Sequence, residues 1–195
     1  MKAELHTDIS CLYQITSCKF RRGQSVRHNI LAPYQRYPVA DLSGITILGL
    51  GGISNPRFLV PEGHLLQEKD FADFYELTKI FAKRNPLLFT THSPKKYSSN
   101  SGLDHIKSGI NVGEDILTKI RRNIGSKFAV SGHIHEAYGI IDPETETPLN
   151  QTQFYDKLDF NPGAAYDHLQ RPNLKPAAGI LEFKDGKARA RIINL

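Results

Sequence analysis

Short apolar runs alternate with amphipathic stretches through the middle of this chain, and that alternation limits the fold more than any other feature of the sequence. The runs at Ile45–Leu50, Leu87–Thr91 and Phe128–Ser131 predict buried strands. Between successive runs, apolar residues recur at helical spacing in residues 70–83 and 113–123. Strand, helix, strand, helix, strand in this order is typical of a layered α/β protein, in which helices cover a sheet.

Each of the two expected helices has one apolar stripe, which we expect to face the core. The stripe of the first helix contains Phe71, Phe74, Leu77, Ile80 and Phe81, and that of the second contains Ile116, Leu117, Ile120 and Ile124. Pro86 follows the first helix and Gly125 follows the second, at positions where these residue types commonly end a helix. Aromatic side chains at this spacing indicate core packing rather than a surface on which a ligand stacks.

The C-terminal part of the chain predicts further strands. We expect them at residues 158–160, 179–183 and 188–193. Asp185-Gly186 stands between the last two strands and is a strong signal for a tight hairpin. Residues 142–153 are rich in Glu, Thr, Pro, Asn and Gln and predict an exposed loop.

Three histidines follow two of the expected strands. His92 comes directly after the strand that ends at Thr91, and His133 and His135 come just after the strand that ends at Ser131. The carboxyl ends of strands are where open α/β sheets place their chemistry, and imidazole is the commonest metal ligand. These residues therefore predict a metal site. The other histidines that we interpret as ordinary hydrogen-bonded loop residues are His64, His105 and His168.

The spacing of the histidine pair matters for this prediction. In a regular strand, residues two apart point to the same face. Gly132 precedes the pair and frees the backbone to turn, so the rings of His133 and His135 can point to two different metal ions.

Other protein classes with a His-X-His pair fit less well. The zinc-dependent β-lactamase-like hydrolases continue with Asp and His directly after the pair, where this chain has Glu136-Ala137. Amidohydrolases carry their pair near the start of the chain. A zincin helix needs His-Glu-X-X-His, which this sequence lacks.

Four segments, in one order, resemble the C-terminal half of the calcineurin-like metallophosphoesterases. The first is the strand and Gly-rich turn at residues 45–52, and the second is Thr91-His92-Ser93-Pro94 with Gly102-Leu103-Asp104 and residues 109–113 downstream. The third is Gly132-His133-Ile134-His135-Glu136, and the fourth is the turn Asn161-Pro162-Gly163. The resemblance covers residues 45–165.

The resemblance implies a fold and a metal centre. The fold would be a partial four-layer α-β-β-α sandwich with mixed sheets. His92 and His133 would bind one metal ion and His135 the other, with Mn, Fe, Zn or Ni as the cation. The side chains that we expect to orient these ligands from outside the metal's own contacts are Glu136, Tyr138, Asp104 and Asn161.

The family's first three metal motifs are not found in this chain. They read Asp-X-His, Gly-Asp-X-X-Asp and Gly-Asn-His-Asp/Glu, and the third supplies the general-acid histidine. Glu4-Leu5-His6 is only an echo of the first, and His28-Asn29 has the residues of the third in the wrong order. No catalytic acid is therefore identified, and we expect one metal ion, with two only if missing ligands are supplied.

These observations support two hypotheses about function. The first is a metal-dependent phosphoesterase-like hydrolase, acting on phosphate mono- or diesters, whose N-terminal part is truncated or degenerate. The second is a non-catalytic binding protein that keeps a vestigial three-histidine metal site.

Residues 1–39 lack a clear period, so we treat them as an atypical N-terminal segment and residues 40–195 as the metallophosphoesterase-like domain. Without the strands that carry the family's first three motifs, one sheet would expose an apolar face and a strand edge. Either this segment or a second copy of the chain would need to cover them. A homodimer is therefore a reasonable expectation.

Composition bounds the partners and the compartment. The net charge is +5, and the segment 1–39 holds a basic cluster, which we interpret as a solvated arm; nucleic acid is a weaker alternative. The cluster consists of Lys19, Arg21, Arg22, Arg27 and Arg36. Cys11 and Cys18 form no zinc or disulfide pattern, and no long apolar run or secretory signal is present. We therefore expect a cytoplasmic protein without a membrane partner.

Overall fold

The computed structural model describes residues 5–7, 39–42, 45–54, 65–81, 86–100, 102–163 and 176–194. Several sequence features that were named above lie outside these residues. They are Glu4, Cys11, Cys18, the basic cluster between Lys19 and Arg36, His28, His64 and His168.

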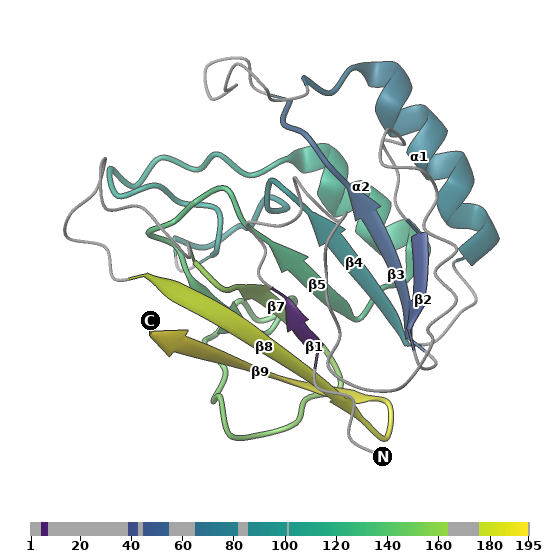
Figure 1. Ribbon diagram of the computed structural model, residues 1–195. Coiled ribbons are helices and arrows are strands. Elements are labelled where there is room, and N and C mark those ends of the chain that lie inside the picture. Colours follow the sequence, from purple (N-terminus) through teal and green to yellow (C-terminus); the bar gives the residue numbers. More distant parts are fainter. Residues whose placement is uncertain are drawn as a thin grey trace.

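The larger of two sheets is mixed and has six strands in the order β2-β3-β4-β5-β7-β6 (Figure 1). Its strands are β2 (Val39–Leu42), β3 (Ile45–Leu50), β4 (Leu87–Thr91), β5 (Phe128–Ser131), β6 (Gly139–Ile141) and β7 (Leu158–Asn161). The inner strands β3, β4, β5 and β7 run parallel to one another, whereas β2 and β6 are antiparallel to their neighbours at the two edges. Four parallel strands therefore end along one edge of the sheet.

Two helices connect the parallel strands, as the sequence pattern predicts. α1 (Glu68–Phe81) lies between β3 and β4 in the chain, and α2 (Asp115–Ile124) lies between β4 and β5. Figure 1 shows both helices on the same side of the larger sheet. Gly125 ends α2 in the left-handed conformation, with φ 64°, as expected of a C-terminal cap.

The smaller sheet has three antiparallel strands in the order β1-β8-β9. They are β1 (Leu5–Thr7), β8 (Ala177–Lys184) and β9 (Lys187–Asn194). Asp185 and Gly186 form the hairpin turn between β8 and β9, with φ 52° and 75°, which is the backbone geometry of a type I′ turn. The hairpin prediction is confirmed.

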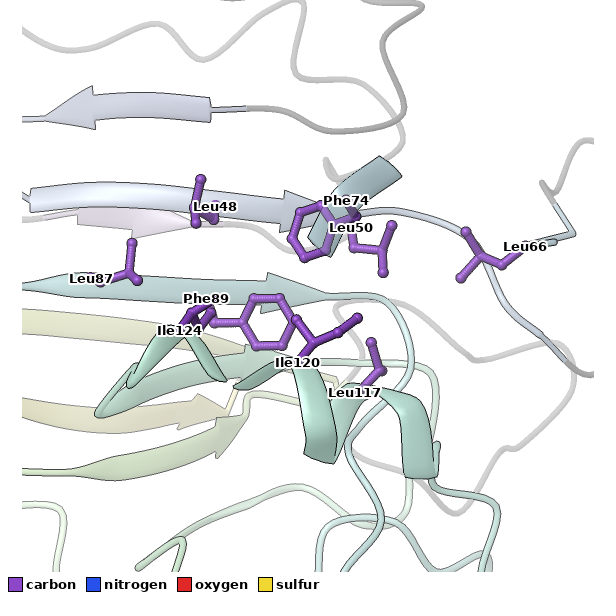
Figure 2. Close-up of a cluster of buried hydrophobic side chains, with 9 residues drawn as sticks. All are labelled: Leu48, Leu50, Leu66, Phe74, Leu87, Phe89, Leu117, Ile120 and Ile124. Carbon is purple, nitrogen blue, oxygen red and sulfur yellow. The ribbon is translucent and has the colours of Figure 1, made fainter. Parts of the chain in front are cut away.

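Alternation along the parallel strands builds two cores. Leu87 and Phe89 of β4 face the helices, whereas Leu88 between them faces the smaller sheet. The core on the helix side contains Leu48, Leu50, Leu66, Phe74, Leu87, Phe89, Leu117, Ile120 and Ile124 (Figure 2). The core between the sheets contains Leu88, Phe128, Val130, Ile140, Leu158, Phe160, Leu181, Ala188 and Ala190.

The protein is thus α/β, with a helix layer, a mixed sheet and a small antiparallel sheet. This much of the predicted fold class is confirmed. Within the described residues, both helices pack on the larger sheet, so the second helix layer of a four-layer sandwich is not among them.

Two strands come from the part of the chain for which the sequence predicts no regular structure. β1 pairs with β8 of the smaller sheet, and β2 pairs with β3 of the larger one. Residues 5–7 therefore cover the β8 edge of the smaller sheet, and residues 39–42, at the start of the expected domain, cover the β3 edge of the larger sheet. The homodimer stays a prediction.

The predicted core stripe of the first helix is wrong at Ile80. Phe74 is fully buried, but Ile80 is 70% exposed. Ile80 lies six residues after Phe74, which places it about 120° around the helix from the buried side chain. The stripe is therefore narrower than the sequence pattern indicates.

No helix in the described part of the chain is long and apolar enough to cross a membrane.

Phe74→Ala should lower the free energy of unfolding by about 3–5 kcal/mol, because it leaves a cavity among packed side chains. Ile80→Ala on the same helix should change it by less than about 0.5 kcal/mol. Urea unfolding followed by circular dichroism measures both variants. Equal losses would contradict this assignment of the buried face.

Candidate metal centre

Strand pairing brings two of the predicted ligands together. Thr91, the last residue of β4, pairs with Ser131, the last residue of β5. Beyond this pair, the backbone amide of Gly132 donates to the carbonyl of His92 across 3.0 Å, and the amide of His92 donates to the carbonyl of Leu50 at 3.3 Å. His92 is thus fixed between the ends of β3 and β5, at the carboxyl edge of the parallel strands.

The imidazoles of His92 and His133 are in direct contact. Nε2 of His92 lies 3.1 Å from Nδ1 of His133, and the two ring planes are tilted by 60°. The contact is a hydrogen bond when one ring nitrogen carries a proton. Two nitrogens that bind one tetrahedral zinc ion at the usual bond length lie about 3.3 Å apart. The observed spacing therefore fits two ligands of one cation.

The backbone turn at this site is centred on His133. Its φ is 65°, and the amide of Ile134 donates to the carbonyl of Gly132 at 2.7 Å. This three-residue turn with a positive φ is a strained conformation for a residue other than glycine, and it costs about 1–3 kcal/mol. The sequence predicts that the backbone turns at Gly132, but the residue with the positive φ is His133, the candidate ligand.

Burial keeps the lone pair of His92 available to a cation. Burial first, and then the nearby His133 and His135 imidazoles, lower the pKa of His92 from 6.5 to about 4. His92 is therefore neutral at physiological pH, which is the protonation state that a metal requires. The effect of His135 also places that ring within electrostatic reach of His92.

The described residues do not contain a complete cage. No group of three or more His, Cys, Asp or Glu side chains among them is arranged to hold a metal ion. The structure thus brings His92 and His133 together, and the ligand roles of all three histidines stay predictions.

Asn161 holds the backbone that carries the histidine pair. It is fully buried at the end of β7, and its Nδ2 donates to the carbonyls of Ile134 at 2.8 Å and of Ala137 at 3.1 Å. Its Oδ1 accepts from the amide of Gly163 at 3.0 Å. Asn161 therefore fixes the main chain on both sides of His135.

The other predicted supporting residues lie around this segment. Glu136 accepts a hydrogen bond from the backbone amide of Lys107 at 3.1 Å, and Tyr138 is 49% exposed. Asp104 is fully buried; it accepts from the amide of Tyr97 at 2.6 Å, and its other oxygen lies 2.8 Å from Nδ1 of His105. This distance allows an ion pair, but Oδ1 of Asp104 and Nδ1 of His105 make no hydrogen bond with a described residue, so the hydrogen-bonded interpretation of His105 stays a prediction.

A buried ion network supports the loop after His92, and sequence reasoning missed it. Asp159 of β7 is 2% exposed and pairs with the guanidinium of Arg121 on α2. The hydroxyl of Tyr97 donates to Asp159 at 2.5 Å, and Nζ of Lys95 lies 3.7 Å from the same carboxylate. Burial, and then the charge of Asp159, raise the pKa of Tyr97 well above 10.0, so its hydroxyl keeps the proton that it donates.

Comparisons with known proteins bear on the fold alone. No protein-family model and no curated protein matches this chain. Five solved protein chains match it in structure, and one superposes with a TM-score of 0.50 at 14% sequence identity. That match covers 78% of this chain and 51% of the other, so this chain spans about half the length of the solved one.

The low pKa of His92 predicts a pH-dependent stability of the metal-free protein. Because the unfolded state binds the proton more tightly, the stabilisation is fully present above the unfolded pKa of 6.5 and is lost as the pH falls toward about 4. The free energy of unfolding should fall by up to about 3 kcal/mol more in the wild type than in His92→Asn over this window. Urea titrations in EDTA test this. Parallel pH profiles of the two proteins would contradict it.

Asn161→Ala should lower the free energy of unfolding by about 2–4 kcal/mol, because two buried carbonyls lose their donor. It should also weaken zinc binding, since the backbone around His135 is no longer fixed. Asn150→Ala removes an exposed asparagine and is the matched control. Calorimetric zinc titration and urea unfolding measure both effects, and an Asn161 variant as stable as the control would be the contrary result.

Proposed function

We propose that this protein is a metal-dependent phosphoesterase-like hydrolase of the calcineurin-like type, which acts on phosphate mono- or diesters. The observation that carries the proposal is the 3.1 Å contact between ring nitrogens of His92 and His133 at the carboxyl edge of four parallel strands. These two histidines come from the two metal motifs by which the sequence resembles that family. The remaining support is the order of the other matching segments.

The chain's own residues have distinct parts in this proposal. His92 and His133 would hold one cation through neutral ring nitrogens, and His135 would contribute to a second. A divalent cation, when bound, supplies a Lewis acid that stabilises charge on the phosphoryl oxygens. The strained turn at His133 and the Asn161 clamp keep the ligands in place before the cation arrives. Nitrogen ligands of this kind suit Mn, Fe, Zn or Ni.

The proposal extends to the fold. The two stacked sheets and the helix layer agree with three layers of the family's α-β-β-α sandwich. A further helix layer on the outer face of the smaller sheet is the part that we propose beyond them.

Activity on bis-p-nitrophenyl phosphate with added Mn²⁺ tests the function. His133→Ala should lower the rate at least about 100-fold, since even residues that only support a ligand contribute tenfold or more. His105→Ala removes the imidazole that pairs with Asp104 and should retain most of the activity. A wild-type rate of hydrolysis no higher than the rate without protein, or equal losses of activity in the two variants, would contradict a phosphoesterase.

A second candidate is a non-catalytic binding protein that keeps the histidine site. Two observations favour it. The described residues contain no group of three or more side chains arranged to hold a metal ion, and the sequence lacks the motif that supplies the general-acid histidine. Cation binding that depends on His92 and His133 without any turnover would identify this function. A phosphate-ester ligand stays the proposed partner in either case.

A further inference from the structure

Two exposed apolar side chains border the segment that carries His133 and His135. The large hydrophobic residues that are exposed in the described part of the chain are Ile80, Ile110, Tyr138 and Ile193. Tyr138 lies three residues after His135, and Ile110 lies in a loop that contacts Glu136. Apolar exposure beside a polar site indicates a ligand surface more strongly than scattered exposure does.

Tyr138 is fixed at its backbone and free at its ring. The preceding carbonyl, of Ala137, is held by Asn161 at 3.1 Å. A Cβ atom on Gly163 would lie 3.2 Å from Cβ and 3.6 Å from Cγ of Tyr138, so the root of the side chain packs on the turn after β7. The residue is nevertheless 49% exposed.

The loop that Glu136 contacts, at residues 106–110, adds an exposed apolar residue and a positive charge. The amide of Ile106 donates to the carbonyl of Ile110 at 3.0 Å, and Gly109, with φ 79°, closes the turn between them. Lys107 in this turn is anchored to Glu136 by its amide, and its exposed ammonium has no ion pair within the described residues. The residues on either side of the Lys107–Glu136 bond thus include the exposed Tyr138, the 59% exposed Ile110 and the ammonium of Lys107.

We propose that Tyr138 and Ile110 form a subsite for a planar aromatic group of an anionic phosphate ester, which stacks on the Tyr138 ring while its phosphoryl group faces the histidines. This inference rests on the proposed function, because it takes the histidine cluster as the phosphoryl site. Stacking suits the arrangement, since a ring whose root is packed loses little freedom when a second ring covers it. The Lys107 ammonium favours an anionic ligand over a neutral one.

The test compares two non-hydrolysable ligands that share the phosphonate group and differ in the aromatic ring. Calorimetry of the Mn²⁺-loaded protein with phenylphosphonate and with methylphosphonate gives the ratio of the two dissociation constants. The wild type should bind the phenyl compound about five- to tenfold more tightly. Tyr138→Phe should keep this preference, Tyr138→Ala should abolish it, and Ile80→Ala should leave it unchanged, since Ile80 is an exposed apolar residue of α1.

The outcomes separate this inference from the proposed function. A preference that survives in Tyr138→Ala, a wild type that binds both ligands equally, or a wild type that binds neither overturns the subsite. A preference that is lost only in Tyr138→Ala supports it, whether or not the protein hydrolyses bis-p-nitrophenyl phosphate. Hydrolysis without any effect of Tyr138 on the preference leaves the phosphoesterase standing and removes the subsite.

Discussion

The candidate site depends on the parallel pairing of β4 with β5. Since Thr91 is opposite Ser131, the two strands end at the same level, and the next residues in each strand's direction are His92 and Gly132-His133. The bond from the amide of Gly132 to the carbonyl of His92 extends this register by one step. A slip of one residue would reverse which side chains face each core and would separate the two imidazoles. The packing of Leu88 against one core and Phe89 against the other therefore also sets the position of the site.

Two unfavourable features lie at the histidines, because His133 has a positive φ and His92 is buried in its neutral form. Asn161 offsets them, since its buried amide donates to two carbonyls of the same segment. Strain of this kind persists only where neighbouring structure overdetermines it, and it concentrates at functional sites. The Asp159–Arg121 pair contributes on the other side, because it ties β7 and α2 to the loop that follows His92. Imidazole ligands supply no negative charge, so a first cation at this site would be held by nitrogen lone pairs alone. A second cation beside it would need further ligands that carry negative charge.

Local sequence pattern predicts the elements whose signal is short-range. The strands at Ile45–Leu50, Leu87–Thr91 and Phe128–Ser131 begin and end where the apolar runs do, and the Asp185-Gly186 turn has the expected geometry. β1 and β2 escape prediction because they are short and owe their conformation to pairing with β8 and β3 rather than to a period of their own.

Some features of the candidate site could likewise be predicted from the sequence, and others could not. The meeting of His92 and His133 follows from strand order, which the sequence indicates through two apolar runs that end at histidines. The strained turn at His133 and the buried Asp159–Arg121 pair depend on contacts between segments that are distant in the sequence. No residue spacing predicts either feature. Ile80 shows the opposite error, since a residue at helical spacing proves exposed when the helix touches the sheet along a narrow stripe.

The central claim is that His92 and His133 bind one cation together. Crystals grown with Zn²⁺ and measured on both sides of the zinc absorption edge test it most directly. We predict one anomalous peak in contact with Nε2 of His92 and Nδ1 of His133, the two atoms that now lie 3.1 Å apart. A map in which these rings stay bonded to each other, with zinc absent from the space they share, would contradict it.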